Sequence, residues 1–157
     1  MKSFRIIIAD DDMDDFDLLK AVLLEQNSNL VIEHAGNGRE LLDILNTNYK
    51  TGKGSPDLIL LDINMPKING IQALSILKSK KETSDIWVLI YSTSNSPEQM
   101  ELCYKLGANG FVTKSHSVKR MTEFANKINS FLQDIHPETA LGFFKSLQKS
   151  RVLNSSN

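Results

Sequence analysis

Short apolar runs alternate with longer amphipathic stretches along most of the chain, and this alternation restricts the fold more than any other feature. The runs are rich in β-branched and other apolar residues with few polar interruptions, as in strands buried on both faces of a parallel sheet. Strict alternation of strands and helices predicts an α/β fold with a doubly wound parallel sheet. The five expected strands are Arg5–Ala9, Leu30–His34, Leu58–Leu61, Trp87–Tyr91 and Gly110–Thr113.

The amphipathic stretches carry apolar residues at helical spacing. Phe16, Leu19 and Leu23, for example, recur at i, i+3 and i+7 and so share one face of a helix. Pro97 suits the first turn of a helix, where its missing N–H costs nothing. The expected helices lie around Phe16–Leu23 and Leu41–Leu45, and over Gly70–Ser79, Pro97–Leu106 and Val118–Ile135.

Two segments fall outside this pattern. Asn46–Ser55 is polar and contains glycine and lysine, so we expect a long loop before the third strand. Glu138–Lys149 has apolar residues at helical spacing and predicts one short C-terminal helix, in which Phe143 and Phe144 pack against the domain. The polar end, Asn154–Asn157, is expected to fray.

Charge and cysteine content exclude several classes of protein. Eighteen basic and 19 acidic residues give a formal net charge of −1, so no overall positive field attracts nucleic acid or an anionic membrane. Cys103 is the single cysteine, which excludes an intrachain disulfide and fits a reducing cytoplasm. No apolar run is long enough to span a membrane. We therefore expect a cytoplasmic protein that binds neither nucleic acid nor membrane directly.

Polar and charged residues stand where the expected strands end. Asp10 and Asp11 follow the first strand, Asp62 follows the third, Ser92 ends the fourth and Lys114 follows the fifth. Because the carboxyl ends of parallel strands meet at one edge of a sheet, these side chains are expected to converge there. Neighbouring carboxylates repel one another and favour a divalent cation. Oxygen ligands with no histidine or cysteine nearby indicate Mg²⁺ or Mn²⁺.

Simpler roles remain open for some of these acids taken singly. Asp12 stands where the first helix needs an N-cap, and Asp62 could form a turn with Asn64. Capping does not explain the adjacent pair Asp10 and Asp11.

An aspartate carboxylate can also attack a phosphoryl group. Such a transfer requires mainly positioning and charge neutralisation, which a divalent cation and a lysine ammonium would supply.

Four motifs, in this order, carry a resemblance to a known family. They are Ile6 to Asp12 (IIIADDD), Leu60 to Pro66 (LLDINMP) with Asn69-Gly70 after it, Tyr91 to Ser94 (YSTS) and Gly107 to Lys114 (GANGFVTK). The spacings between them also agree with the family pattern. The chain resembles a response regulator receiver domain, the phosphoacceptor of two-component signalling. The resemblance implies a flavodoxin-like (βα)5 fold with strand order 2-1-3-4-5, followed here by a C-terminal helical extension.

The resemblance implies a role for each residue at the strand ends. Asp62 corresponds to the phosphoacceptor. Asp10 and Asp11, together with Asp62 and the backbone carbonyl of Asn64, correspond to the metal ligands. The residues that would contact the phosphoryl group are Lys114, Ser92 and Thr93.

The resemblance also implies a conformational switch, with Ser92 and Phe111 at the switch positions. In the family, phosphorylation is coupled to inward movement of this hydroxyl and aromatic ring, which remodels the face formed by the fourth helix, fifth strand and fifth helix. This chain departs from the family in two places. Ser115 replaces the usual proline after Lys114, and Phe111 replaces the common tyrosine, so a switch through Phe111 must act by packing alone.

The resemblance covers residues 4–133, which we expect to form the receiver domain, and leaves 134–157 as the C-terminal extension. This extension is too short for a separate output domain. We therefore expect a stand-alone regulator, similar to those that pair with phytochrome-type kinases. Its expected partners are a histidine kinase or histidine phosphotransfer protein, a downstream protein target and a second copy of the chain.

Three alternatives remain to be weighed. A receiver-fold scaffold could work without phosphorylation. A phosphatase of the haloacid dehalogenase type also uses an aspartate nucleophile and Mg²⁺, but it needs an acid where this chain has Asn64. A flavodoxin-type flavin carrier needs a first loop rich in serine, threonine and glycine, whereas Asp10, Asp11 and Asp12 would repel a phosphate.

We expect no enzyme activity beyond self-phosphorylation and autodephosphorylation. No histidine has a partner at metal-ligand spacing.

Overall fold

The five expected strands form one parallel sheet. The computed structural model describes residues 2–152. Its strands pair in the order β2-β1-β3-β4-β5, which confirms the flavodoxin-like topology. All neighbouring strands are parallel. The strands are β1 (Phe4–Ala9), β2 (Leu30–Ala35), β3 (Leu58–Leu61), β4 (Val88–Ser92) and β5 (Gly110–Thr113).

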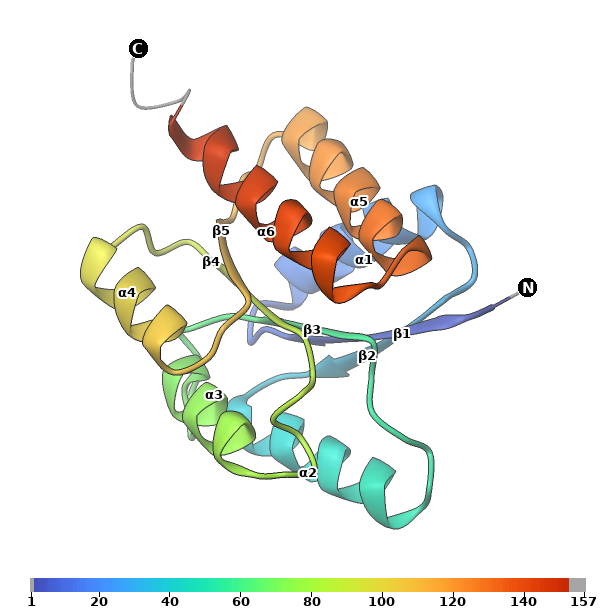
Figure 1. Ribbon diagram of the computed structural model, residues 1–157, viewed down its shortest axis with the longest axis vertical. Coiled ribbons are helices and arrows are strands. Elements are labelled where there is room, and N and C mark those ends of the chain that lie inside the picture. The colour runs from blue at the N-terminus through green and yellow to red at the C-terminus, as the bar shows by residue number, and fades with distance from the viewer. Residues whose placement is uncertain (1, 153–157) are drawn as a thin grey trace.

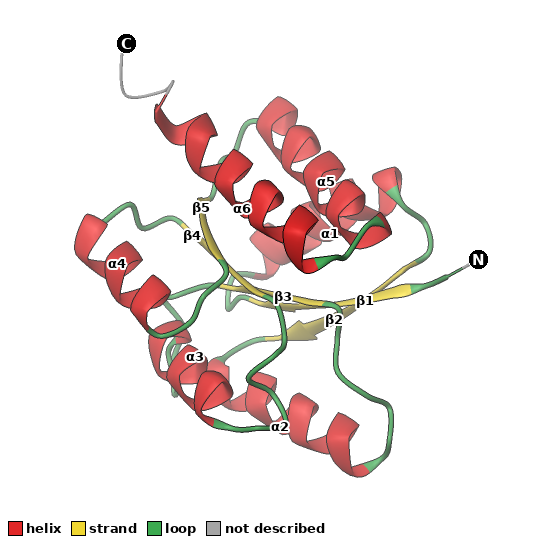
Figure 2. Ribbon diagram, viewed as in Figure 1, coloured by secondary structure: helices red, strands yellow, loops and turns green. Residues whose placement is uncertain are grey.

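Helices cover both faces of the sheet, as Figures 1 and 2 show. Helices α1, α5 and α6 lie on one face, and α2, α3 and α4 lie on the other. Within the described residues, no helix combines the length and apolar character that crossing a bilayer requires. The helices are α1 (Met13–Gln26), α2 (Gly38–Lys50), α3 (Gly70–Ser79), α4 (Pro97–Lys105), α5 (Val118–Gln133) and α6 (Pro137–Val152).

The central strands bury side chains on both faces, which explains their mostly apolar composition. In β1, Ile6 and Ile8 pack with the α1–α5–α6 side, whereas Ile7 and Ala9 pack with the α2–α3–α4 side. The same alternation continues in β3 and β4. Burial of this apolar surface is the main force that holds the two helical layers on the sheet.

Side-chain caps start five of the helices. The Asp12 carboxylate accepts hydrogen bonds from the N–H groups of Asp14 and Asp15 at the start of α1, which confirms its capping role. Asn69 and Gln72 form a capping box at the start of α3. Asn37, Ser96 and Ser117 cap α2, α4 and α5.

The helix boundaries differ from expectation in three regions, the smallest difference being that α4 ends at Lys105 rather than at Leu106. The expected loop Asn46–Ser55 is wrong in its first half, because α2 continues to Lys50. Those first residues are polar but include neither glycine nor proline, so nothing in the backbone ends the helix before Gly52. At the other end, α5 stops at Gln133 rather than Ile135, because Asp134 leaves helical geometry.

The C-terminal helix is longer than the expected short helix. Helix α6 has 16 residues, as many as α5. Its buried Phe144 ring lies 5.7 Å from the Trp87 ring and 5.5 Å from the Phe131 ring, so it packs against the domain as expected. A Cβ at Gly110 would stand 2.6 Å from Phe144, so this close approach of α6 to β5 depends on glycine. The expected frayed end, Asn154–Asn157, lies outside the described residues.

Phe144→Ala is expected to lower the free energy of unfolding by about 3 kcal/mol, because a buried ring is lost and leaves a cavity. Trp87 is the only tryptophan of the chain and stacks on Phe144. The fluorescence emission of Trp87 should therefore shift to the red in Phe144→Ala, because water can reach the indole ring once Phe144 is gone. Denaturant unfolding followed by tryptophan fluorescence measures both effects. Phe143→Ala, at a partly exposed neighbour, should cost much less; equal losses would contradict the docking of α6 through Phe144.

Candidate functional site

The carboxyl ends of the central strands bring the expected residues to one edge of the sheet. Beyond β1, the Asp10 N–H donates to the carbonyl oxygen of Ala35 at 2.9 Å. Beyond β3, the Asp62 N–H donates to the carbonyl oxygen of Ala9 at 2.9 Å. Beyond β5, the Lys114 N–H donates to the carbonyl oxygen of Ser92 at 2.8 Å. Each of these residues is thus held by the backbone of the neighbouring strand.

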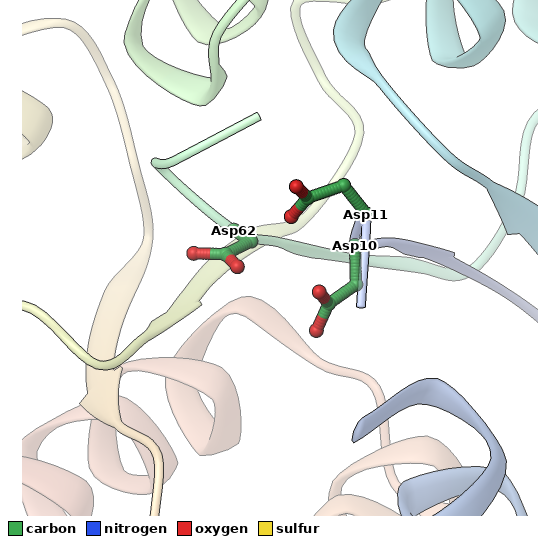
Figure 3. A group of neighbouring side chains, drawn as sticks. All are labelled: Asp10, Asp11 and Asp62. Carbon is green, nitrogen blue, oxygen red and sulfur yellow. The ribbon is translucent and has the colours of Figure 1, made fainter. Parts of the chain in front are cut away.

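Three carboxyl groups gather at the ends of β1 and β3, as Figure 3 shows. One oxygen from each of Asp10, Asp11 and Asp62 lies within 4.8 Å of the others. The side chains of Asp10 and Asp62 are only 3% and 8% exposed, whereas Asp11 is exposed. The cluster therefore has two buried acids at its base and one acid open to solvent.

A single ammonium group lies among these acids. The Nζ atom of Lys114 is 2.6 Å from Asp10 Oδ2, 3.0 Å from Asp62 Oδ2 and 3.0 Å from Asp15 Oδ2. The Lys114 side chain is 5% exposed, and all peptide bonds of the described residues are trans, including the one before Ser115. Three carboxylates around one ammonium leave two negative charges uncompensated, even before Asp11 is counted.

Burial and hydrogen bonding shift the pKa values of this group. Burial raises the pKa of Asp10 above its ordinary value, even though Lys114 binds it. For Lys114, burial alone would lower the pKa, but the bonds to Asp10, Asp62 and Asp15 outweigh burial and raise the pKa above the ordinary value of 10.5. Lys114 therefore stays charged throughout the physiological range.

The donor set fits a hard divalent cation. Carboxylate oxygens are the ligands that Mg²⁺ and Mn²⁺ prefer, and the excess negative charge of the cluster gives a cation a favourable place. Asn64 follows Asp62 in the same loop, where its N–H donates a long 3.4 Å bond to Asp62 Oδ1. Asp10, Asp11 and Asp62 together with the Asn64 carbonyl are thus a chemically reasonable ligand set for Mg²⁺.

The backbone of Asp62 is fixed by a close approach of helix α3. A Cβ at Gly70 would stand 2.0 Å from the Asp62 carbonyl oxygen, so only glycine fits there. The Gly70 N–H also donates to the carbonyl oxygen of Ile63 at 2.8 Å. This contact gives a physical reason for the Asn69-Gly70 pair that follows the Asp62 motif.

The two expected switch residues are buried on neighbouring strands. Ser92 is fully buried at the end of β4, where its hydroxyl oxygen accepts a long 3.4 Å bond from the Ser94 N–H. Phe111 is 1% exposed and packs in the core with residues such as Ile90 and Cys103. Thr93, which the sequence placed next to the phosphoryl group, is exposed. Of the three residues, Ser92 and Phe111 are thus buried and Thr93 is not.

Two residues at this edge received no role from the sequence. Asp15 binds Lys114 from the first turn of α1, a contact that no local spacing in the sequence indicates. His34, at the end of β2, has Nε2 2.8 Å from the Asp10 carbonyl oxygen. Because a carbonyl oxygen only accepts hydrogen bonds, the Nε2 atom of His34 carries the hydrogen of this bond and is its donor. Its ring also lies 4.3 Å from that of Phe16.

Comparison with known proteins gives a single consistent result. The family model described as "Response regulator receiver domain" matches residues 6–126. Response regulator Rcp1 of Synechocystis sp. is 34% identical over 76 residues, which cover 48% of this chain and 52% of Rcp1. The transcriptional regulatory protein CpxR of Escherichia coli is 30% identical over 132 residues, covering 84% of this chain and 50% of CpxR. The matched part of this chain thus spans about half the length of these relatives.

Solved structures lead to the same family. The phosphorylated cyanobacterial phytochrome response regulator RcpA is 26% identical, with a TM-score of 0.77 over 86% of this chain and 97% of RcpA. The Mn²⁺-bound form of Rcp1 is also 26% identical, with a TM-score of 0.72 over 82% of this chain and 94% of Rcp1.

Proposed function

The chain belongs to the response regulator receiver domain family, and on this basis we propose that it accepts a phosphoryl group on Asp62 in a Mg²⁺-dependent reaction. The donor is a histidine kinase or a histidine phosphotransfer protein. The observation that carries the proposal is the single cluster in which the Asp62 carboxylate lies beside Asp10, Asp11 and the Lys114 ammonium. The phosphorylated state of the related RcpA supports it.

In the proposed transfer, a carboxylate oxygen of Asp62 attacks the phosphorus atom of a phosphohistidine. The P–N bond breaks, and its electron pair stays on the imidazole nitrogen of the donor while an acyl phosphate forms on Asp62. Hydrolysis of this acyl phosphate resets the protein. Asn64 stands two residues later with an amide side chain, which cannot serve as general acid or base, so turnover of other phosphoesters is not expected.

The residues around Asp62 divide the remaining work. Asp10, Asp11 and Asp62, with the Asn64 carbonyl, would hold a Mg²⁺ ion, which would supply positive charge next to the phosphoryl oxygens. Lys114 donates a hydrogen bond to one phosphoryl oxygen, and the Ser92 hydroxyl, with Thr93 beside it, contacts another. These new contacts bias the switch formed by Ser92 and Phe111.

Output is proposed to pass through the face of α4, β5 and α5. Leu102 on α4 and Val118 at the start of α5 are large apolar residues that are 42% and 66% exposed. The partner is a downstream protein or a second copy of this chain. Residues 4–133 form the receiver domain of this proposal, and 134–157 form the extension that carries α6 along α5 and β5.

The proposal is tested by intact-mass measurement after incubation with Mg²⁺ and acetyl phosphate, with acid quenching. The proposal is supported if one phosphoryl group is added in the presence of Mg²⁺ and none is added when a chelator is present before acetyl phosphate. No adduct under conditions where Mg²⁺ binding is verified would contradict it and leave a receiver-fold scaffold that works without phosphate.

Asp11→Asn is expected to weaken Mg²⁺ binding about tenfold or more, because it removes a charged ligand from the open side of the cluster. Titration calorimetry measures the affinity. Asp12→Asn is the matched control, since it removes the same charge one residue away and asparagine still caps α1. Unchanged affinity in Asp11→Asn, or an equal loss in both variants, would overturn the metal assignment.

A further inference from the structure

Asp15 is the third carboxylate on the Lys114 ammonium and comes from a helix rather than from a strand end. Its Oδ2 atom lies 3.0 Å from Lys114 Nζ. Its side chain is 22% exposed, compared with 3% for Asp10 and 8% for Asp62. Asp15 is therefore the partner of Lys114 that water reaches most easily.

The ammonium group has no spare donor while these bonds are formed. A lysine ammonium has three N–H bonds and no acceptor, and Lys114 has three carboxylate partners, Asp10, Asp15 and Asp62. A phosphoryl oxygen on Asp62 also needs an N–H from Lys114. Unless the Asp62 carboxyl oxygen gives up its own bond, either Asp10 or Asp15 must do so.

Burial decides which of these two acids releases Lys114. Asp10 makes the shorter bond, at 2.6 Å, and its side chain is only 3% exposed, so water cannot readily take the place of the ammonium there. Asp15 can exchange its bond for water at little cost. On the basis of the function proposed above, we propose that Asp15 is a positioning residue: it holds one N–H of Lys114 in the unphosphorylated protein and yields it to the phosphoryl group on Asp62.

Asp15→Asn tests this role against Asp14→Asn as the matched control. Both variants remove one negative charge from the first turn of α1, but the Asp14 side chain is exposed. At saturating Mg²⁺ and high ionic strength, Asp15→Asn should be phosphorylated by acetyl phosphate about fivefold faster, as expected for the loss of one partly exposed ion pair. Asp14→Asn should match the wild type, and Asp15→Glu, which keeps a carboxylate, should stay close to it. An unchanged or slower rate in Asp15→Asn, or equal acceleration in Asp14→Asn, overturns the proposal.

A second measurement does not depend on phosphorylation. Nitrogen-15 NMR follows exchange of the Lys114 ammonium protons with water, which should become several-fold faster in Asp15→Asn and stay unchanged in Asp14→Asn. Unchanged exchange in Asp15→Asn shows that Asp15 does not hold the ammonium and overturns the inference. If the wild type takes no phosphoryl group while exchange responds as expected, the proposed function fails but the hold of Asp15 on Lys114 is supported.

Discussion

Asp62→Asn is expected to abolish phosphorylation and to leave the fold intact. The amide has nearly the shape of the carboxylate but is a poor nucleophile toward phosphorus, so no acyl phosphate forms. The fold should tolerate the change, because removing one of several crowded acids also relieves repulsion with Asp10. Intact mass after incubation with Mg²⁺ and acetyl phosphate should show one phosphoryl group on the wild type and none on the variant.

The control for this experiment is Asp43→Asn, at an exposed position of α2 on the surface of the protein. It should take up the phosphoryl group as the wild type does. An adduct of equal yield on Asp62→Asn would mean that another residue is phosphorylated, and mapping the labelled peptide would then identify it.

Lys114→Ala is expected to lower the free energy of unfolding by about 3 kcal/mol in the absence of divalent cations, as for removal of one partner of a buried ion pair. Without Lys114, the buried Asp10 and Asp62 face each other with no compensating cation. Urea denaturation with a chelator present measures the loss. Added Mg²⁺ should recover part of it, because the cation replaces the missing positive charge.

The pH dependence of this loss follows from the raised pKa of Lys114. A cation whose pKa is higher in the folded than in the unfolded chain stabilises the fold fully below the unfolded value, here 10.5, and loses that contribution as the pH rises through the folded value. The contribution of Lys114 to the free energy of unfolding is therefore constant from neutral pH to about pH 9.

Lys105→Ala is the control for Lys114→Ala, because the ion pair of Lys105 with Glu101 is exposed and should contribute at most about 0.5 kcal/mol. Equal stability of Lys114→Ala and the wild type would contradict the buried ion cluster.

The same variant separates phosphate binding from the switch. Lys114→Ala keeps Asp10, Asp11 and Asp62, so Mg²⁺ should still bind. The phosphoryl group would then lack its bond to β5, and the amide NMR shifts of Phe111 on phosphorylation should be much smaller than in the wild type. A full wild-type response would show that another residue couples the phosphoryl group to β5.

Elements defined by local chemistry could be predicted from the sequence. Apolar runs such as Leu58–Leu61 indicated buried strands, and Asp12 and Pro97 are residue types that favour helix starts. The convergence of Asp10, Asp62 and Lys114 followed from the rule that parallel strands place their ends at one edge. Helix α6 runs from Pro137 to Val152 and is longer than expected, and its packing through Phe144 against Trp87 is a tertiary contact.

By itself, the sequence determined the order of strands and helices along the chain, the Asp12 cap and the identity of the acids at the strand ends, because these depend on side-chain type and on spacing over a few residues. The tertiary structure decided which groups share the Lys114 ammonium: Asp10 and Asp15 lie 104 and 99 residues before it in the chain. It also decided that His34 contacts the Asp10 backbone. Hydrogen bonds act over about 3 Å, and no local pattern specifies distances of that size between segments brought together only by folding.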